Sequence, residues 1–116
     1  MATLYLITKS PFIHNDPSEA VRVAILQRNR EEKIGVVLLQ DAVLGVKKEQ
    51  FSEKEESFEQ LLLEALGKGV DIYALEPDLK ARAIKPEEII EGVAQIGYPK
   101  LVDLIMDEYE KIVSWT

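Results

Sequence analysis

Cysteine is absent from this 116-residue sequence, and histidine occurs only once, as His14. A chain without a thiol cannot carry sulfur, form a disulfide or use a thiolate as a nucleophile. Only Asp16 stands near His14 as a second plausible metal ligand, so His14 is expected to be a surface loop residue rather than part of a metal site. Chemistry that needs a sulfhydryl group would therefore have to come from another polypeptide.

Long apolar stretches and an excess of basic residues are also missing. No apolar run approaches the roughly 20 residues that cross a bilayer, and the first residues lack the charged start and apolar core of a signal peptide. We therefore expect a cytoplasmic protein without membrane contact. Lys and Arg number 14 against 21 Asp and Glu, which gives a net charge of −7. This charge opposes free-standing binding to nucleic acid, although it allows action on RNA within a larger complex.

Motifs of common enzyme classes do not occur either. There is no Gly-x-Ser-x-Gly sequence for a hydrolase nucleophile and no Gly-x-x-x-x-Gly-Lys sequence for a phosphate loop. We expect no cofactor.

Three apolar runs have the length of strands, and each stops at a short polar cluster. They cover Leu4–Thr8, Ile34–Leu39 and Val70–Leu75. A short fourth strand is predicted at Val93–Ile96 and a fifth strand at Lys111–Trp115. Helical segments alternate with these runs. The alternation predicts a single α/β domain over residues 1–116, with three α/β/α layers and a five-stranded parallel sheet. In such folds, ligands and partners bind beyond the carboxyl ends of the strands.

The predicted helices have recognisable ends. The first is expected to start with Asp16 as its capping residue and to reach about Asn29. The second should begin at a capping box of Ser52 and Glu55 and run to Leu66. A helical turn is predicted at Asp78–Arg82, and a last helix from Pro99 to about Glu110. The inward face of that last helix is expected to hold Leu101, Val102, Ile105, Met106 and Tyr109.

Polar residues after the strands are the candidates for a site. Lys9 and Ser10 could hold an anion, or Ser10 could serve only the turn before Pro11. Asp41 is either a helix cap or a polar contact at a subunit junction, and an acid–base enzyme using Asp41 is a weaker alternative. Asp78 and Arg82, four residues apart, predict either a local ion pair or a contact to a neighbouring subunit.

One aromatic residue next to the end of the chain has two possible roles. Trp115 is predicted to pack on the terminal strand or to be buried against another subunit, since aromatic residues are enriched in interface cores.

Several segments together resemble the DsrH/TusB branch of the DsrE/DsrF/DsrH sulfur-relay proteins. The matching pieces keep their order along nearly the whole chain: Lys9-Ser10-Pro11-Phe12, Val37-Leu38-Leu39-Gln40-Asp41, Ile72 through Arg82, Tyr98 with Val102-Asp103-Leu104, and Ser114-Trp115. The resemblance implies a three-layer fold with a five-stranded parallel sheet. It also implies assembly with similar subunits, as a homo-oligomer or with DsrE/DsrF-like or TusC/TusD-like partners. The implied role is sulfur transfer, in dissimilatory sulfur metabolism or in the formation of 2-thiouridine in tRNA.

Two positions depart from that family pattern. Where related proteins can carry a persulfide-bearing cysteine near the start of the first helix, this chain has Ala20, and a cysteine placed there is expected to have a lowered pKa. Ala83 stands where the family usually has glycine, and if that glycine serves a positive φ, alanine implies a somewhat different turn. The resemblance thus predicts a non-catalytic subunit, whose rim residues Lys9, Ser10, Asp41, Asp78, Arg82 and Tyr98 position a thiol-bearing partner. The alternative is a homo-oligomeric module that binds a small molecule or an anion at the rim.

Overall fold

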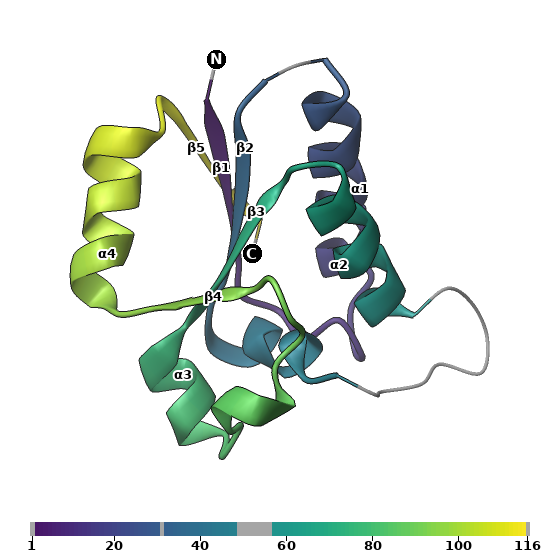
Figure 1. Cartoon of the computed structure of the whole chain (residues 1–116), viewed down its shortest axis with the longest axis vertical. Coiled ribbons are helices and arrows are strands. Elements are labelled where there is room, and N and C mark those ends of the chain that lie inside the picture. Colours follow the sequence, from purple (N-terminus) through teal and green to yellow (C-terminus); the bar gives the residue numbers. More distant parts are fainter. Residues whose placement is uncertain (1, 31, 49–56, 116) are drawn as a thin grey trace.

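The computed structural model describes residues 2–30, 32–48 and 57–115, and it contains one parallel sheet (Figure 1). The strands are β1 (Thr3–Ile7), β2 (Ile34–Leu38), β3 (Asp71–Leu75), β4 (Ala94–Ile96) and β5 (Lys111–Trp115). Their order across the sheet is β4-β3-β2-β1-β5, and every neighbouring pair is parallel. This confirms the predicted fold class, with strand ends that differ from the predicted ones by no more than one residue.

Helices cover both faces of the sheet. The helix α1 (Asp16–Arg28) and the helix α2 (Phe58–Gly67) lie on one face, and α4 (Tyr98–Asp103) lies on the other (Figure 1). The π-helical turn η3 (Leu104–Glu108) continues α4. The 3-10 helices η1 (Gln40–Val46) and η2 (Pro86–Glu88) gather with α3 (Glu76–Ala81) beyond the carboxyl ends of the strands. In the described part of the chain, no helix is long and apolar enough to cross a membrane.

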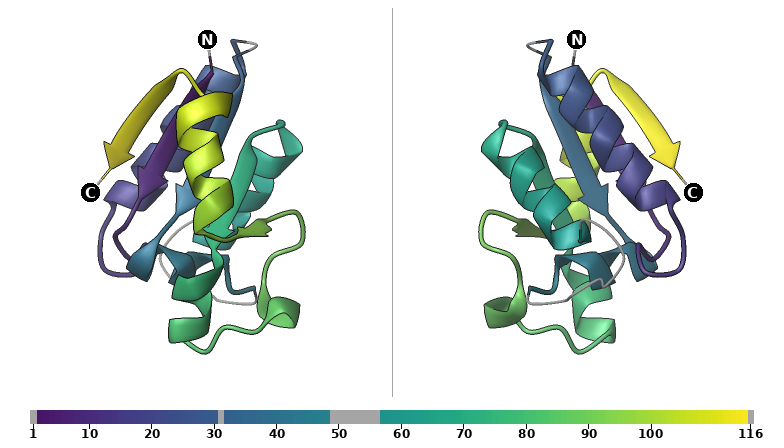
Figure 2. Two further views of the ribbon diagram at one scale, coloured as in Figure 1. Left: turned by 90° about the vertical axis from the view of Figure 1, so that its left-hand side faces the viewer. Right: turned by 90° about the vertical axis from the view of Figure 1, so that its right-hand side faces the viewer.

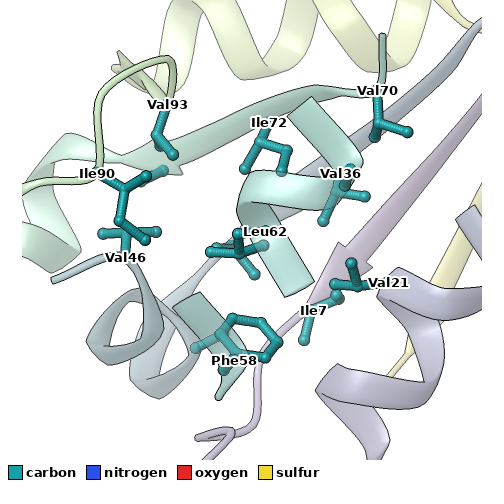
Figure 3. Packing of buried hydrophobic residues seen from close by; sticks show 14 of the residues in the cluster. Ile7, Val21, Val36, Val46, Phe58, Leu62, Val70, Ile72, Ile90 and Val93 are labelled. Atoms are coloured by element: carbon teal, nitrogen blue, oxygen red, sulfur yellow. The ribbon is translucent and has the colours of Figure 1, made fainter. Parts of the chain in front are cut away.

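The main core lies between the sheet and the pair α1 and α2. Val36 and Ile72 of the sheet face Val21 of α1 and Leu62 of α2, and Phe58 closes the end of this layer (Figure 3). A smaller cluster on the α4 side contains Leu4, Val37, Leu75, Ile96, Leu104 and Tyr109. Successive residues of β2 therefore bury their side chains on opposite faces, which explains why this strand is apolar without alternation.

The predicted caps of the first two helices differ from the observed ones, and the helical segments predicted from Asp78 and Pro99 begin at Glu76 and Tyr98. Asn15 is the residue before the first helical residue of α1, and Asp16 is the first residue inside the helix. The Asp16 carboxylate makes an ion pair with Lys9 at 3.1 Å instead of capping the helix. The predicted capping box of Ser52 and Glu55 lies outside the described residues. The observed α2 begins later, with Ser57 accepting a hydrogen bond from the Gln60 backbone N–H at 3.1 Å.

The inward face of the last helix was predicted only in part. Leu101 and Ile105 are half-buried and Tyr109 is buried, but Val102 and Met106 are 55% and 73% exposed. Leu104, which was not predicted to face inward, is fully buried. The cause is the π-helical turn, in which the Tyr109 N–H donates to the Leu104 carbonyl at 3.1 Å. This five-residue spacing puts Leu104 and Tyr109 on one face, whereas α-helical spacing would not.

Gly35 in β2 is required by the packing of Tyr109. A Cβ atom at this position would lie 2.8 Å from Cζ of Tyr109 and 2.9 Å from Cδ1 of Leu4. The absence of a side chain therefore lets the Tyr109 ring lie directly on the sheet.

Candidate functional site

Polar side chains from two distant segments meet at the carboxyl ends of β2 and β3. Arg82, which follows α3, donates to Oδ1 of Asp41 in η1 from Nη2 at 2.8 Å and from Nε at 3.3 Å. Its Nη1 also donates to the backbone carbonyl of Asp78 at 3.2 Å. Asp78 in turn accepts a hydrogen bond from the backbone N–H of Gln40 at 2.7 Å, through Oδ2. We call Gln40, Asp41, Asp78 and Arg82 the rim cluster.

The backbone is strained next to both ion-paired residues of the rim cluster. Gln40, before Asp41, has a φ of 50°, and Ala83, after Arg82, has a φ of 55°. These are the only non-glycine residues with positive φ among those that the structure describes. Side chains disfavour this region by about 1–2 kcal/mol per residue. Such strain often gathers at functional sites, so its position supports a functional role for the rim cluster.

Ala83 takes the conformation that usually belongs to glycine at a helix end. Its N–H donates to the Lys80 carbonyl at 3.1 Å, and the Ile84 N–H donates to the Leu79 carbonyl at 3.0 Å. This pair of bonds is the Schellman motif, with Ala83 in the left-handed position. The expectation that alanine would produce a different turn is therefore wrong, because the turn keeps its positive φ.

A cavity of about 240 Å³ opens beside the rim cluster. Apolar side chains of Leu39, Leu75 and Leu101 form part of its wall, and Gln40, Asp78 and Tyr98 supply its polar groups. Tyr98, the first residue of α4, is 57% exposed. The cavity thus joins two of the predicted rim residues, Asp78 and Tyr98, which the sequence separates by 20 positions.

Lys9 and Ser10 lie in a separate loop, after β1. The Lys9 amine is paired with Asp16, and the buried Ser10 accepts a hydrogen bond from the Phe12 backbone N–H at 3.3 Å through Oγ. Neither residue lines the cavity beside the rim cluster. An anion at Lys9 stays a prediction, and it would have to compete with the Asp16 carboxylate.

Ala20, at the position that the resemblance assigns to a carrier cysteine, is the fifth residue of α1 and is fully buried. The electrostatic effect of a helix start fades beyond the first turn, and burial raises the pKa of a thiol. The expectation that a cysteine at this position would have a lowered pKa is therefore not met by this geometry.

Trp115 packs within its own subunit. Its ring centroid lies 6.1 Å from that of Tyr5, with the ring planes tilted by 56°. The indole is only half-buried, because β5 is the outermost strand of the sheet. The first of the two roles predicted for this residue is thus observed, and a contact with another subunit stays a prediction.

Perturbed tyrosines lie away from the rim cluster. Burial raises the pKa of Tyr109, and the neighbouring Tyr73 and Asp71 raise it further. Burial likewise raises the pKa of Tyr73. The Tyr109 hydroxyl donates to Asp71 at 3.5 Å, at the start of β3, and the Lys33 amine lies 4.8 Å from the centre of the Tyr109 ring. These groups stabilise the core on the α4 side and are remote from the carboxyl ends of the strands.

The arrangement at the rim is suited to binding rather than to covalent chemistry. Both carboxylates already accept hydrogen bonds from within the chain, Asp41 from Arg82 and Asp78 from Gln40. In the described residues no group of three metal-ligating side chains occurs. Sequence reasoning had identified Asp41, Asp78, Arg82 and Tyr98 individually. It missed Gln40 as a site residue, because the sequence contains no signal for a positive φ at glutamine.

Comparison with known proteins agrees with this geometry. The model of the DsrH-like protein family matches residues 9–111. An uncharacterized protein of Methanocaldococcus jannaschii, MJ0989, is 30% identical over 110 residues, which are 95% of this chain and 96% of that protein. An uncharacterized protein of Methanopyrus kandleri, MK0008, is 26% identical over 102 residues, 88% of this chain and 84% of the relative.

Solved structures share the fold. The crystal structure of the ychN protein from E. coli superimposes with a TM-score of 0.88 at 19% identity, over 98% of this chain and 99% of that one. The matched range contains β2, β3, β4 and the whole rim cluster, whereas β1 and all but the first residue of β5 lie outside it. This chain belongs to the DsrH-like family.

Proposed function

We propose that this chain is a non-catalytic subunit of a sulfur-relay assembly and that its rim cluster positions a thiol-bearing partner. One observation carries the proposal: this chain matches the DsrH-like family over residues 9–111, yet it contains no cysteine. A persulfide needs a sulfur atom on the protein, so the carrier cysteine must belong to another subunit. DsrE/DsrF-like or TusC/TusD-like proteins are the expected partners.

The exposed parts of the rim supply the contact. The Asp41 side chain is 65% exposed although it is held by Arg82, and Tyr98 presents an aromatic ring beside the same cavity. Arginine and aromatic side chains are enriched in protein interfaces, and here the Arg82 guanidinium is held in place by Asp41. The rim cluster therefore acts as a pre-organised docking surface, held in place before the partner arrives.

The sulfur carried by the partner would go either to dissimilatory sulfur metabolism or to 2-thiouridine in tRNA. With a net charge of −7, this chain does not contribute a binding surface for tRNA by itself. A strain that lacks the gene separates the two destinations. Loss of 2-thiouridine from bulk tRNA would assign the chain to tRNA thiolation, and unchanged tRNA would assign it to the other pathway.

The test of the relay role is purification of the tagged chain from its native cells. We expect cysteine-bearing subunits of similar size, and ³⁵S supplied by a cysteine desulfurase should be found on those subunits. Arg82→Ala should weaken the association. Lys80→Ala is the matched control, because Lys80 of α3, two residues before Arg82, pairs only with Glu76 of the same helix in the described structure. A stable assembly without any thiol-bearing subunit would contradict the proposal.

The cavity favours a second candidate, a module that binds a small molecule. Its wall combines leucine side chains with the Asp78 carboxylate, which suits a ligand with an apolar body and a hydrogen-bond donor rather than an anion. Native mass spectrometry of the purified protein would detect such a ligand as an added mass. That mass should disappear in Tyr98→Ala, which removes one wall, and remain in the distant Leu26→Ala.

A further inference from the structure

The strand β5 is an open edge of the sheet. Among the described residues it pairs only with β1, and Figure 2 shows no element on its outer side. An open edge presents unpaired N–H and C=O groups that can pair with another chain. The helices on the two faces of the sheet cover β5 only in part, because the side chains of Ile112, Val113 and Trp115 are half-buried.

The opposite edge is protected in a way that β5 is not. Only three residues make up β4, and two of them, Ala94 and Gln95, are exposed polar or small residues. Short edge strands of this kind resist pairing with other chains. In contrast, β5 has five residues, three of them large and apolar, with no proline inside the strand and a single charged residue, Lys111.

We propose that β5 pairs with β5 of a second copy of this chain, antiparallel and with a two-fold axis at Val113. The inference rests on the free edge and not on the sulfur-relay function, so either can fail without the other. The result is a ten-stranded sheet that is continuous across two subunits.

The hydrogen-bond pattern of β5 selects this register. The Lys111 N–H donates to the Ala2 carbonyl at 3.1 Å, toward β1. Backbone N–H and C=O groups alternate in direction along a strand. Those of Val113 and Trp115 therefore also point to β1, whereas those of Ile112 and Ser114 point away from the sheet. An axis at Val113 places each Ile112 opposite Ser114 of the second copy. The residues of each such pair then form two hydrogen bonds, each N–H donating to the C=O of the opposite residue. With an axis at Ile112 or Ser114, the other residue whose backbone groups point outward would lie opposite a residue that is not part of β5.

The side chains of this register are also compatible. Val113 meets its own copy across the axis, and Lys111 lies opposite Trp115 of the second copy, on the face shared with α1. A lysine beside an indole is a favourable cross-strand pair. No like charges meet, since Lys111 is the only charge in the strand. The half-exposed side chains at positions 112, 113 and 115 become covered.

A cysteine-free chain allows a direct test by cross-linking. In Val113→Cys the two introduced thiols would lie across a non-hydrogen-bonded pair, where Cα atoms are about 4.5 Å apart and a disulfide can form. With oxidised glutathione we expect a covalent dimer to form roughly tenfold faster than in Ser114→Cys, whose two copies lie on a diagonal about 7–8 Å apart. Gln95→Cys on the β4 edge is the control for random collisions. Equal rates in all three variants would overturn the proposal.

The unmodified protein gives a second readout. Amide hydrogen exchange at Ile112 and Ser114 should slow down as the protein concentration rises, because only the dimer engages these outward N–H groups. Light scattering should show a dimer that Val113→Lys converts to a monomer, whereas Gln95→Lys, with the same change of charge, leaves it intact. A monomer at every concentration, or a dimer in which both amides exchange freely, would refute the β5 pairing.

Discussion

Replacing Ala83 by glycine should stabilise the protein, although it removes a methyl group. Ala83 has a φ of 55° in a complete Schellman motif, so its Cβ is held in a region that costs a side chain about 1–2 kcal/mol. Glycine avoids this cost but has more conformational freedom to lose on folding, worth about 0.5–1 kcal/mol. The difference predicts a gain of about 0.5–1 kcal/mol in the free energy of unfolding, or roughly 2–5 °C in the melting temperature.

Urea unfolding followed by far-ultraviolet circular dichroism measures this difference, because a shift of the midpoint at constant slope reports stability. Ala81→Gly is the matched control. It makes the same chemical change two residues earlier, at the exposed last residue of α3, where the backbone is still helical and glycine should cost about 0.5–1 kcal/mol. The two variants should therefore shift the midpoint in opposite directions. If Ala83→Gly lowers stability as much as Ala81→Gly does, the interpretation of the turn as strained is refuted.

Three other predictions follow from the packing. Gly35→Ala should lower the free energy of unfolding by about 1–3 kcal/mol in urea titrations, because the new Cβ would press on the Tyr109 ring; unchanged stability would contradict that packing. The raised pKa values of Tyr73 and Tyr109 favour the protonated phenols in the folded state. Their stabilisation is complete below the ordinary pKa of about 10 and is lost as the pH rises above it toward the folded values. Tyr109→Phe should therefore flatten the fall in the free energy of unfolding that denaturant titration measures above about pH 10. Ala20→Cys should react with Ellman's reagent only slowly and with a raised thiol pKa, since position 20 is fully buried; fast reaction at neutral pH would show an accessible thiol.

The sheet could be predicted from the sequence because each strand is a local apolar run. In β2 every residue from Ile34 to Leu38 is buried, which is what an unbroken apolar run indicates for a central parallel strand. Helical spacing also accounts for the buried stripe of α2, in which Phe58, Leu61, Leu62 and Ala65 are buried and Leu66 is half-buried. Hydrophobic spacing decides such elements with little influence from the rest of the chain.

The last helix shows where that reasoning fails. The residues from Leu101 to Tyr109 offer apolar side chains on more than one helical face. The choice between the faces depends on the π-helical turn at η3, which tertiary packing of Leu104 and Tyr109 against the sheet supports. The sequence contains no separate signal for the five-residue repeat.

The site was predicted in its position but not in its internal contacts. The ends of the apolar runs locate the carboxyl-end rim, and Asp41, Asp78 and Arg82 all lie there. Their pairing, however, depends on how α3 is oriented, and Arg82 reaches a carboxylate that is 41 residues away in the sequence. Local rules predicted the Asp78–Arg82 ion pair, which is present at 3.9 Å, but they did not predict the shorter Asp41–Arg82 pair at 2.8 Å.

Magnitudes indicate which contact holds the rim cluster in its strained shape. Two left-handed non-glycine residues together cost about 2–4 kcal/mol, whereas an ion pair as exposed as Asp41–Arg82 contributes at most about 1 kcal/mol. The bond from the Gln40 N–H to Asp78 is short and charge-assisted, and Asp78 is only 19% exposed, so this bond contributes about 1.5–3 kcal/mol. Asp78 and the Schellman bonds therefore maintain the backbone of the rim. Asp41 and Arg82 are not needed for that task, which leaves their exposed groups available to a partner.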